Sequence, residues 1–210
     1  MEILRLREAG IETVALRAAR VLREGGVILF PTDTLYGLGA DALSDAAVAK
    51  IYAIKGRDDG KPIHGIVADT AMAQRYGEWN DCAKKLCDAF FPGALTLIVA
   101  KKSEFSTGVL RGIDTFGFRI PANDLCIEIA RTFDAPFTAT SANKSGVDPS
   151  RSFDETIERL ADRADLIDLA IDAGELVPSL PSTVVDISSG NLVILREGAI
   201  SAEKVRSEAA

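Results

Sequence analysis

The amino-acid sequence predicts an α/β (α+β) protein in which helices pack on a mixed parallel and antiparallel sheet. Short apolar runs typical of strands alternate with segments of helical periodicity along the chain. Several of these runs end in hydroxyl or amide side chains. The 210 residues, 47% of them hydrophobic, contain no internal repeat or interdomain linker. We therefore expect one domain over residues 1–210, with a core of about 11–200 and a short tail at 201–210.

Helices are predicted where apolar residues recur every three or four positions behind a capping side chain. The expected helices cover residues 11–24, 45–54 after Ser44, 81–90 after Asn80 or Asp81, 125–133 after Asn123, and 153–164 after Ser152. Ser152 and Glu155 have the spacing of a capping box. A short, fraying helix is expected in the tail.

Strands are predicted where apolar and β-branched residues form short runs between turn-forming residues. The expected strands are 27–30, 63–68, 94–100, 112–121, 136–140 and 166–173, followed by a hairpin over 182–198. A loop with two prolines covers 176–181. The alternation of these strands with short helices favours a mixed sheet covered by helices.

The stretch 25–43 joins a buried strand to a polar turn. Pro31 ends the apolar run, because proline has no N–H for the ladder. Three hydrogen-bonding side chains follow and then two glycines, in the order Thr32, Asp33, Thr34, Gly37 and Gly39. Two interpretations stay open: a ligand cradle at a strand end, lined by glycines, or an internally satisfied polar turn.

A basic cluster follows the helix that ends near residue 54. Lys55, Arg57 and Lys61 lie within seven residues, beside Asp58 and Asp59. In one interpretation the loop is exposed and the aspartates neutralise the bases. In the other it clamps a polyphosphate, since an arginine fork and lysine charges suit phosphate oxygens. The polar turn next to it favours the clamp.

Two further strands carry polar groups. Thr115 and Arg119 are four residues apart, so they share one face of a strand with Gly117 between them. They are suited to a carboxylate or a phosphate, although a solvated sheet face is the alternative. The strand 136–140 feeds a turn that contains Ser141 and Asn143.

The C-terminal hairpin brings distant residues together. Ser188-Ser189-Gly190-Asn191 is a turn signal between two apolar runs. If Ile187 pairs with Leu192, the register places Thr183 opposite Arg196 and returns Arg196 to the end that carries Ser182.

Composition excludes several classes of function. A net charge of −7 argues against a broad nucleic-acid-binding surface. No apolar run approaches the ~20 residues that cross a bilayer, and the N-terminus lacks a signal-peptide core. Three cysteines without a CxxC motif, beside one histidine, indicate buried thiols in a reducing cytoplasm and no metal site.

No nucleophile with a neighbouring base is apparent. The chain has no P-loop GxxxxGK[ST], no Rossmann GxGxxG and no Ser-His-Asp order. The candidate residues instead form a cationic set suited to a nucleotide and a hydroxyl-rich set suited to a small zwitterion. This pattern predicts catalysis by positioning and charge neutralisation.

Five motifs in this order resemble the YrdC/TsaC family of threonylcarbamoyl-AMP synthases. They are residues 31–39, 55–57, 138–143, 181–186 and 196–198. The resemblance runs from about Ala18 to Ile200 and implies a single YrdC-like domain whose twisted sheet has a concave open face. It also implies a nucleotidyltransferase that makes L-threonylcarbamoyl-AMP from L-threonine, bicarbonate and ATP, releasing pyrophosphate, for the threonylcarbamoyladenosine of tRNA.

The resemblance assigns roles residue by residue. The L-threonine-binding residues are Thr34, Arg119 and Ser182, with Arg119 on the carboxylate. The ATP-binding residues are Arg57, Lys61, Thr115, Ser141, Asn143 and Arg196. Lys55 and Arg57 form the Lys-x-Arg motif and are the candidate catalytic residues. Mg²⁺ is expected on the phosphates, and proteins of the threonylcarbamoyl-transfer complex are the expected partners.

The chain departs from the family pattern in two ways. Many members have a histidine four residues after the proline that matches Pro62; Ile66 stands there, and His64 lies two residues earlier on the same strand face. A basic surface for RNA is often described in the family, whereas this chain is acidic, so tRNA binding is expected to be weak or indirect. The alternatives are a non-catalytic RNA-binding or ribosome-assembly factor, and a domain that handles carbamoyl adenylate, as in hydrogenase maturation proteins.

Overall fold

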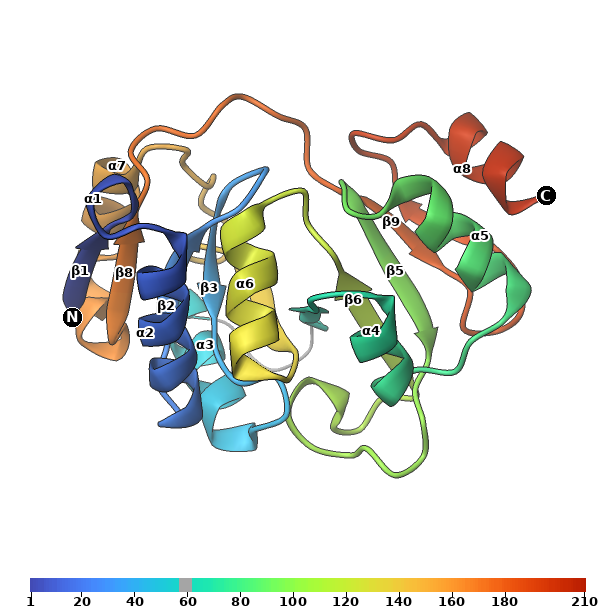
Figure 1. Cartoon of the computed structure of the whole chain (residues 1–210), viewed down its shortest axis with the longest axis horizontal. Helices are drawn as coiled ribbons and strands as arrows, with labels where there is room; N and C mark the ends of the chain where they lie inside the picture. The colour runs from blue at the N-terminus through green and yellow to red at the C-terminus, as the bar shows by residue number, and fades with distance from the viewer. Residues whose placement is uncertain (57–61) are drawn as a thin grey trace.

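A ten-stranded sheet forms the centre of the molecule in residues 1–56 and 62–210, which the computed structural model describes (Figure 1). The strand order is β1-β8-β2-β3-β7-β4-β6-β5-β9-β10. The strands are β1 Glu2–Arg5, β2 Ile28–Pro31, β3 Tyr36–Gly39, β4 His64–Ile66, β5 Leu95–Ala100, β6 Thr115–Arg119, β7 Phe137–Ser141, β8 Leu169–Asp172, β9 Thr183–Asp186 and β10 Val193–Arg196. Parallel pairs, such as β2 with β8, and antiparallel pairs, such as β5 with β6, both occur, so the predicted mixed sheet is confirmed.

Helices cover this sheet. They are α1 Leu6–Ala9, α2 Ile11–Arg23, α3 Asp45–Lys55, α4 Thr70–Tyr76, α5 Asp81–Phe90, α6 Asp124–Phe133, α7 Phe153–Arg159 and α8 Ala202–Ala209, with two 3₁₀ turns, η1 Gly108–Leu110 and η2 Ala161–Leu166. In Figure 1, α2, α6, α4 and α5 lie in front of the strands. Helix α2 packs against α6, and α5 packs against α8 in the tail.

The predicted caps form. The side chain of Ser44 accepts a hydrogen bond from the N–H of Ala47 at 3.3 Å, and that of Asn80 accepts one from Ala83 at 2.8 Å. Asn123 accepts in the same way from Cys126 at 3.0 Å. Each bond satisfies a donor that the first helical turn leaves unpaired.

Aromatic side chains fill the core between these layers. The rings of Phe30 and Phe137 meet edge to face, with centroids 5.2 Å apart, and both side chains are fully buried. Phe116 and Phe118, from β6, are also buried and point to the face covered by α4 and the segment after it, where they meet Tyr76 and Trp79. Since side chains alternate along a strand, the other residues of β6 face the opposite side of the sheet.

The glycines after the polar turn belong to a strand, which corrects the expectation of a glycine-lined turn. Residues Tyr36–Gly39 form β3, which pairs with β2 through Pro31, so Pro31 does not end the ladder. A Cβ at Gly39 would lie 2.9 Å from Ile28 Cγ1 and 3.0 Å from the Phe137 ring. Gly39 is therefore needed for close packing of core side chains in this hairpin.

Two other expectations need correction. The α-helix that begins after Ser152 ends at Arg159, and the 3₁₀ turn η2 replaces the last predicted turn. Only half of the capping box forms, because the carboxylate of Glu155 accepts from Ser150 and Arg159. The Ser152 N–H donates instead to Ser150 Oγ at 3.0 Å. Strand β1, which the sequence analysis did not predict, pairs in parallel with β8.

The C-terminal hairpin has the predicted register near its turn. Val193 pairs with Asp186 and Ile194 with Val185, but a β-bulge then places Arg196 opposite Val184. The expected pairing of Arg196 with Thr183 is therefore wrong by one residue. A bulge adds one residue to one strand and shifts every later pair.

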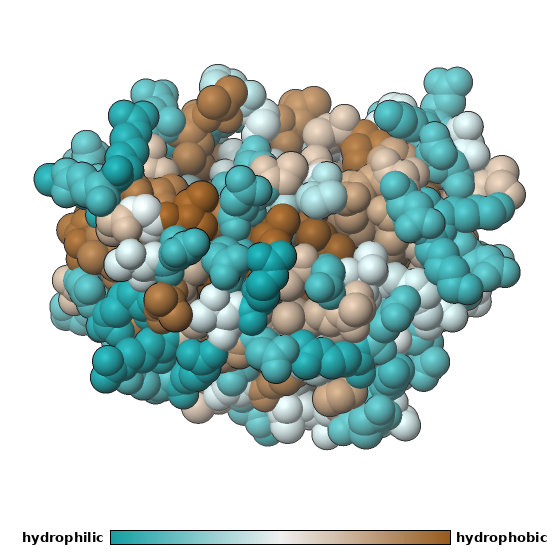
Figure 2. All heavy atoms as spheres, viewed as in Figure 1, coloured by the Kyte–Doolittle hydropathy of each residue, from teal (hydrophilic) through white to brown (hydrophobic). Residues whose placement is uncertain are grey.

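Charged and polar side chains cover most of the helical face, with apolar patches between them (Figure 2). In the part of the chain that the structure describes, every helix is too short or too polar to cross a membrane.

Candidate functional site

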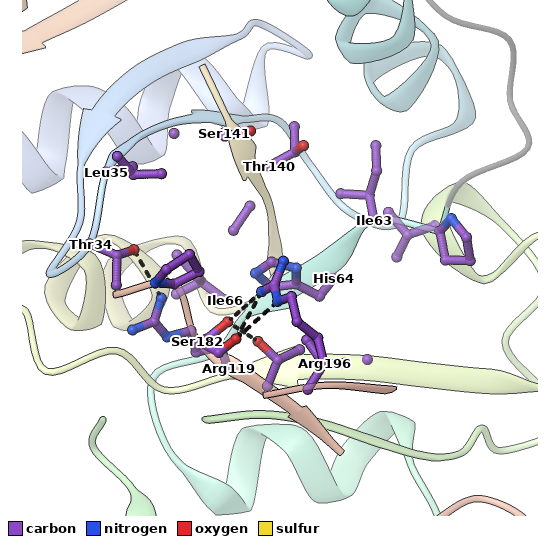
Figure 3. Close-up of a pocket in the computed structure, with 18 of the residues that line it drawn as sticks. Thr34, Leu35, Ile63, His64, Ile66, Arg119, Thr140, Ser141, Ser182 and Arg196 are labelled. Carbon is purple, nitrogen blue, oxygen red and sulfur yellow. Dashed lines mark hydrogen bonds between the residues drawn. The ribbon is translucent and has the colours of Figure 1, made fainter. Parts of the chain in front are cut away.

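A cavity of ≈ 700 Å³ opens on the face of the sheet opposite Phe116 and Phe118 (Figure 3). Its walls come from the tip of the β2–β3 hairpin, from β4 and β6, from the turn after β7, and from β9 and β10. Eight of the predicted site residues line it: Thr34, Lys55, Thr115, Ser141, Asn143, Arg119, Ser182 and Arg196. Arg57 and Lys61 lie outside the described residues. Segments distant in sequence thus converge on a shared hollow.

Strand β6 supplies the floor. Thr115, Gly117 and Arg119 alternate with the buried phenylalanines, so all three face the cavity. Ile66 and His64 of the neighbouring β4 line it as well. The predicted sharing of one strand face by Thr115 and Arg119 is confirmed.

The β2–β3 hairpin tip is held by the hydroxyl of Thr32. Its Oγ1 accepts from the N–H groups of Thr34 and Leu35, at 3.0 and 3.1 Å, and donates to the Leu35 carbonyl at 2.7 Å. Thr34 Oγ1 lies 3.0 Å from Thr32 Oγ1. Thr32 thus satisfies the turn, and Thr34, which is 9% exposed, lines the cavity.

Arg119 is joined to this tip by an aspartate that the sequence analysis assigned no role. Arg119 Nη2 lies 2.8 and 2.7 Å from the two carboxylate oxygens of Asp33. Its Nε donates to the carbonyl of Gly93 at 3.1 Å, and Nη1 lies 3.4 Å from Thr34 Oγ1. Burial lowers the pKa of Arg119, and the charge of Asp33 opposes this shift.

Lys55 ties the end of α3 to the turn after β7. Its side chain is 3% exposed, and Nζ donates to the carbonyls of Ser141 and Asn143 at 2.6 and 3.0 Å. The Ser145 N–H returns a bond to the Lys55 carbonyl at 2.9 Å. Lys55, the first residue of the predicted basic cluster, is thus buried at the cavity wall and holds the turn after β7 in place.

The turn after β7 carries two of the residues predicted to bind ATP, Ser141 and Asn143. Ser141 Oγ is hydrogen-bonded to Asn143 Oδ1, and Asn143 Nδ2 donates to the carbonyls of Lys144 and Val147. These bonds fix the side chains while both residues line the cavity. A rigid polar turn at the end of a strand is suited to a polar ligand.

Arg196 reaches Ser182 across the C-terminal hairpin despite the bulge. Its Nε and Nη2 donate to the Ser182 carbonyl at 3.1 and 2.9 Å, and Nη2 lies 3.1 Å from Ser182 Oγ. Ser182 Oγ also lies 2.9 Å from Thr96 Oγ1. Figure 3 shows Arg196 and Ser182 beside Arg119 and His64.

His64 faces the cavity as a neutral imidazole. Burial lowers its pKa to about 3, and the charges of Arg119 and Arg196 add to the shift. Its ring nitrogens make no hydrogen bond within the described part of the chain. The neutral ring is consistent with a cavity that already holds cations.

Metal ligands do not cluster at this site. Within residues 1–56 and 62–210, no group of three or more histidines, cysteines, aspartates and glutamates is arranged to hold a metal ion. The cavity contributes cations, hydroxyls and amides, which suit anionic and polar organic ligands.

Comparison with known proteins identifies relatives over most of the chain. The family model Sua5_yciO_yrdC, described as "Telomere recombination", matches residues 20–198. A protein of Methanocaldococcus jannaschii is 35% identical over 205 residues, which are 98% of this chain and 95% of the relative. The threonylcarbamoyl-AMP synthases of Pyrococcus abyssi and Bacillus subtilis are 33% and 36% identical to this chain. Their alignments cover 97% and 91% of it. The chain spans 59% and 55% of those two proteins.

Solved structures show the same fold. Sua5 of P. abyssi complexed with L-threonine aligns with a TM-score of 0.87 at 33% identity, over 99% of this chain and 60% of that chain. YciO of Escherichia coli aligns with a TM-score of 0.79 at 26% identity, over 92% and 93% of the two chains.

Proposed function

The chain belongs to the Sua5/YciO/YrdC family, and from that premise we propose that it is a threonylcarbamoyl-AMP synthase. It condenses the amine of L-threonine with bicarbonate into a carbamate, with loss of water, and transfers the adenylyl group of ATP to the carbamate. The products are L-threonylcarbamoyl-AMP and pyrophosphate, and the adenylate supplies the threonylcarbamoyl group for tRNA.

One observation supports the proposal above the others: eight polar residues from six separate segments line a cavity of ≈ 700 Å³. Such a volume lies within the range of small-molecule sites, roughly 300–1,000 Å³. The P. abyssi relative with the same fold was solved in complex with L-threonine. A hollow of this size and chemistry is suited to an amino acid beside a nucleotide.

The amino acid is proposed to bind at the side formed by Thr34, Arg119 and Ser182. The Arg119 guanidinium binds the carboxylate through Nη1, because a charged N–H donates strongly to a carboxylate oxygen. The hydroxyls of Thr34 and Ser182 lie on either side and accept or donate as the substrate requires.

ATP is proposed to bind along Thr115, Ser141, Asn143 and Arg196. Arg57 and Lys61, which lie outside the described residues, complete the phosphate-binding set in this proposal. Lys55 acts there by holding the turn that carries Ser141 and Asn143. The carbamate oxygen attacks the α-phosphate and pyrophosphate leaves, so cations near the phosphates stabilise the developing charge.

Mg²⁺ enters this proposal as the counter-ion of ATP. The described residues provide no carboxylate cluster for it, and Mg²⁺ commonly binds through substrate phosphates and waters. Its chemistry is to neutralise charge on the phosphate oxygens, and the residues of this chain bind and orient the rest of the nucleotide.

The proposed partners are the proteins that transfer the threonylcarbamoyl group to tRNA. The net charge of −7 favours weak or indirect contact of this chain with tRNA itself. A cytoplasmic location, in which the three free thiols stay reduced, belongs to the same proposal.

The test is direct synthesis. The chain is incubated with ATP, Mg²⁺, L-threonine and bicarbonate, and the mixture is searched by mass spectrometry for L-threonylcarbamoyl-AMP. We expect the adenylate to require both threonine and bicarbonate and to disappear in an Arg196→Ala variant. Pyrophosphate release that is unchanged when threonine is omitted would contradict the proposal.

A further inference from the structure

Asp33 lies at the hairpin tip next to Thr34, but it does not line the cavity. Its carboxylate faces Arg119 Nη2, with both oxygens within 2.8 Å. Its Oδ2 also accepts from the N–H of Ala122 at 3.2 Å. The side chains of the pair are 16% and 6% exposed, so solvent screens their attraction only weakly. Asp33 therefore holds the Arg119 guanidinium without itself lining the cavity.

The contacts of Arg119 divide its three nitrogens between different tasks. Nε donates to the Gly93 carbonyl and Nη2 to Asp33, which together fix the plane of the guanidinium. Nη1 lies beside Thr34 Oγ1 at the long distance of 3.4 Å. Among the described residues Thr34 is its only hydrogen-bond partner, so Nη1 retains an N–H for a ligand.

The ion pair of Asp33 with Arg119 also stabilises the buried positive charge of the arginine. A buried guanidinium without a counter-charge destabilises the folded state, because the charge has lost its hydration. Asp33 compensates the charge while leaving one edge of the fork available. The Ser179 hydroxyl donates to the carbonyls of Asp33 and Thr34, at 3.2 and 3.3 Å, and so helps to hold the tip in place.

We propose that Asp33 is a positioning residue: it holds the Arg119 guanidinium so that Nη1 faces the carboxylate of the amino-acid substrate. The proposal rests on the proposed function, in which Arg119 binds that carboxylate. Asp33 itself touches no substrate. Its removal therefore weakens recognition of the carboxylate and leaves the nucleotide side of the cavity unchanged.

The test compares Asp33→Asn with the unmodified chain in steady-state synthesis of the adenylate. Asparagine has the same shape but lacks the charge, so the guanidinium is held less firmly. We expect KM for threonine to rise roughly 10- to 100-fold, as for other residues that orient a binding group, with KM for ATP nearly unchanged. L-threoninol, which lacks the carboxylate, is added as a competing inhibitor. Its inhibition constant is expected to stay the same.

A second variant and a control separate positioning from folding. Asp33→Glu keeps the charge but moves it by one methylene, and we expect a smaller rise in KM for threonine with unchanged thermal unfolding. Asp134→Asn breaks an exposed ion pair, with Arg75 at 3.0 Å, away from the cavity. This control is expected to leave every constant unchanged.

The outcomes distinguish failure of the proposed function from failure of the role assigned to Asp33. An unmodified chain that forms no threonine-dependent adenylate overturns the proposed function and this inference with it. An active chain whose Asp33→Asn and Asp33→Glu variants keep KM for threonine overturns this inference alone. Equal losses of threonine and threoninol recognition also overturn it, because they indicate a general collapse of the hairpin tip.

Discussion

Two buried cations hold turns at the cavity, and they do so in different ways. Arg119 joins the β2–β3 hairpin tip through the Asp33 carboxylate and keeps an N–H next to Thr34. Lys55 joins the turn after β7 by donating to the main-chain carbonyls of Ser141 and Asn143. One cation is held mainly by a side chain and lines the cavity, while the other donates mainly to the backbone.

This difference separates recognition from architecture. An arginine has several donors in a rigid fork, so it can be held by some of them and bind with another. A lysine side chain has one nitrogen, and that of Lys55 donates to the Ser141 and Asn143 carbonyls and lies 3.3 Å from Asn143 Oδ1. Substitutions at Lys55 should therefore lower mainly the stability of the fold. Substitutions at Arg119 should mainly weaken threonine binding.

The largest effect is expected for Lys55→Met. The substitution removes the charged donor from two partly buried carbonyls, of which that of Ser141 still accepts from the Asn143 N–H at 2.9 Å. Hydrogen bonds to charged groups contribute about 1.5–3 kcal/mol each. We expect the free energy of unfolding, measured with urea, to fall by about 2–4 kcal/mol. Lys50→Met is the matched control, since Lys50 lies on the same helix and donates to the Gly25 carbonyl at an exposed position. Equal stability of both variants would contradict a structural role for Lys55.

Arg119→Lys comes next. Lysine keeps the charge beside Asp33 but loses the fork, so either Asp33 or the substrate is left unbound. We expect KM for threonine to rise roughly 10- to 100-fold, which corresponds to about 1.4–2.7 kcal/mol. KM for ATP should change much less. Arg75→Lys, in the exposed pair with Asp134, is the control. If ATP and threonine recognition fall together, the two sides of the cavity are not separable as described.

The pKa of His64 reports on its burial at the cavity floor and on the nearby charges of Arg119 and Arg196. Its folded-state pKa of about 3 lies below the ordinary 6.5, mainly through burial and then through Arg119 and Arg196. Between these values the unfolded chain binds a proton that the folded chain excludes. Stability should therefore fall as pH falls from 6.5 toward 3, by at most ~1.4 kcal/mol per pH unit from this group.

The measurement compares urea unfolding at pH 7 and pH 5. His64 is the only histidine, so His64→Gln removes the effect without a second imidazole to confuse it. The variant should lose less stability than the unmodified chain on acidification. The same loss in both chains would mean that folding does not lower the pKa of His64, which contradicts its burial beside the two arginines.

Much of the site was predictable from local patterns. Strand periodicity placed Thr115 and Arg119 on one face, and the hairpin signal returned Arg196 to Ser182. Runs that end in hydroxyls pointed to Thr34 and Ser141. These inferences need only the geometry of one strand or one turn.

The rest depends on tertiary contacts. Asp33 meets Arg119 across 86 residues of sequence, and nothing in either segment indicates the other. The carbonyls that bind Lys55 carry no sequence signal at all, because every residue has one. The bulge in β10 depends on how the hairpin packs, and it shifts the register without changing the pattern of apolar residues. Likewise, β1 is a four-residue edge strand whose partner β8 lies near the other end of the chain.

The smallest effect is expected for Ser182→Ala, on the proposed threonine side of the cavity. The Ser182 hydroxyl lies between Thr96 Oγ1 at 2.9 Å and Arg196 Nη2 at 3.1 Å. Because Arg196 also donates to the Ser182 carbonyl, alanine keeps the hairpin contact and removes only the hydroxyl. We expect a loss of about 1 kcal/mol in stability, the usual net worth of one hydrogen bond, and a few-fold rise in KM for threonine.

A double-mutant cycle with Thr96→Val decides between two uses of this hydroxyl. If Ser182 serves only the bond to Thr96, the two substitutions together cost no more than either one, and KM for threonine follows stability. If it also contacts the substrate, Thr96→Val alone leaves KM nearly unchanged while Ser182→Ala raises it. The second result is expected, because Ser182 lines the cavity beside Arg119, Arg196 and His64, where a hydroxyl can donate to a ligand that the cations attract.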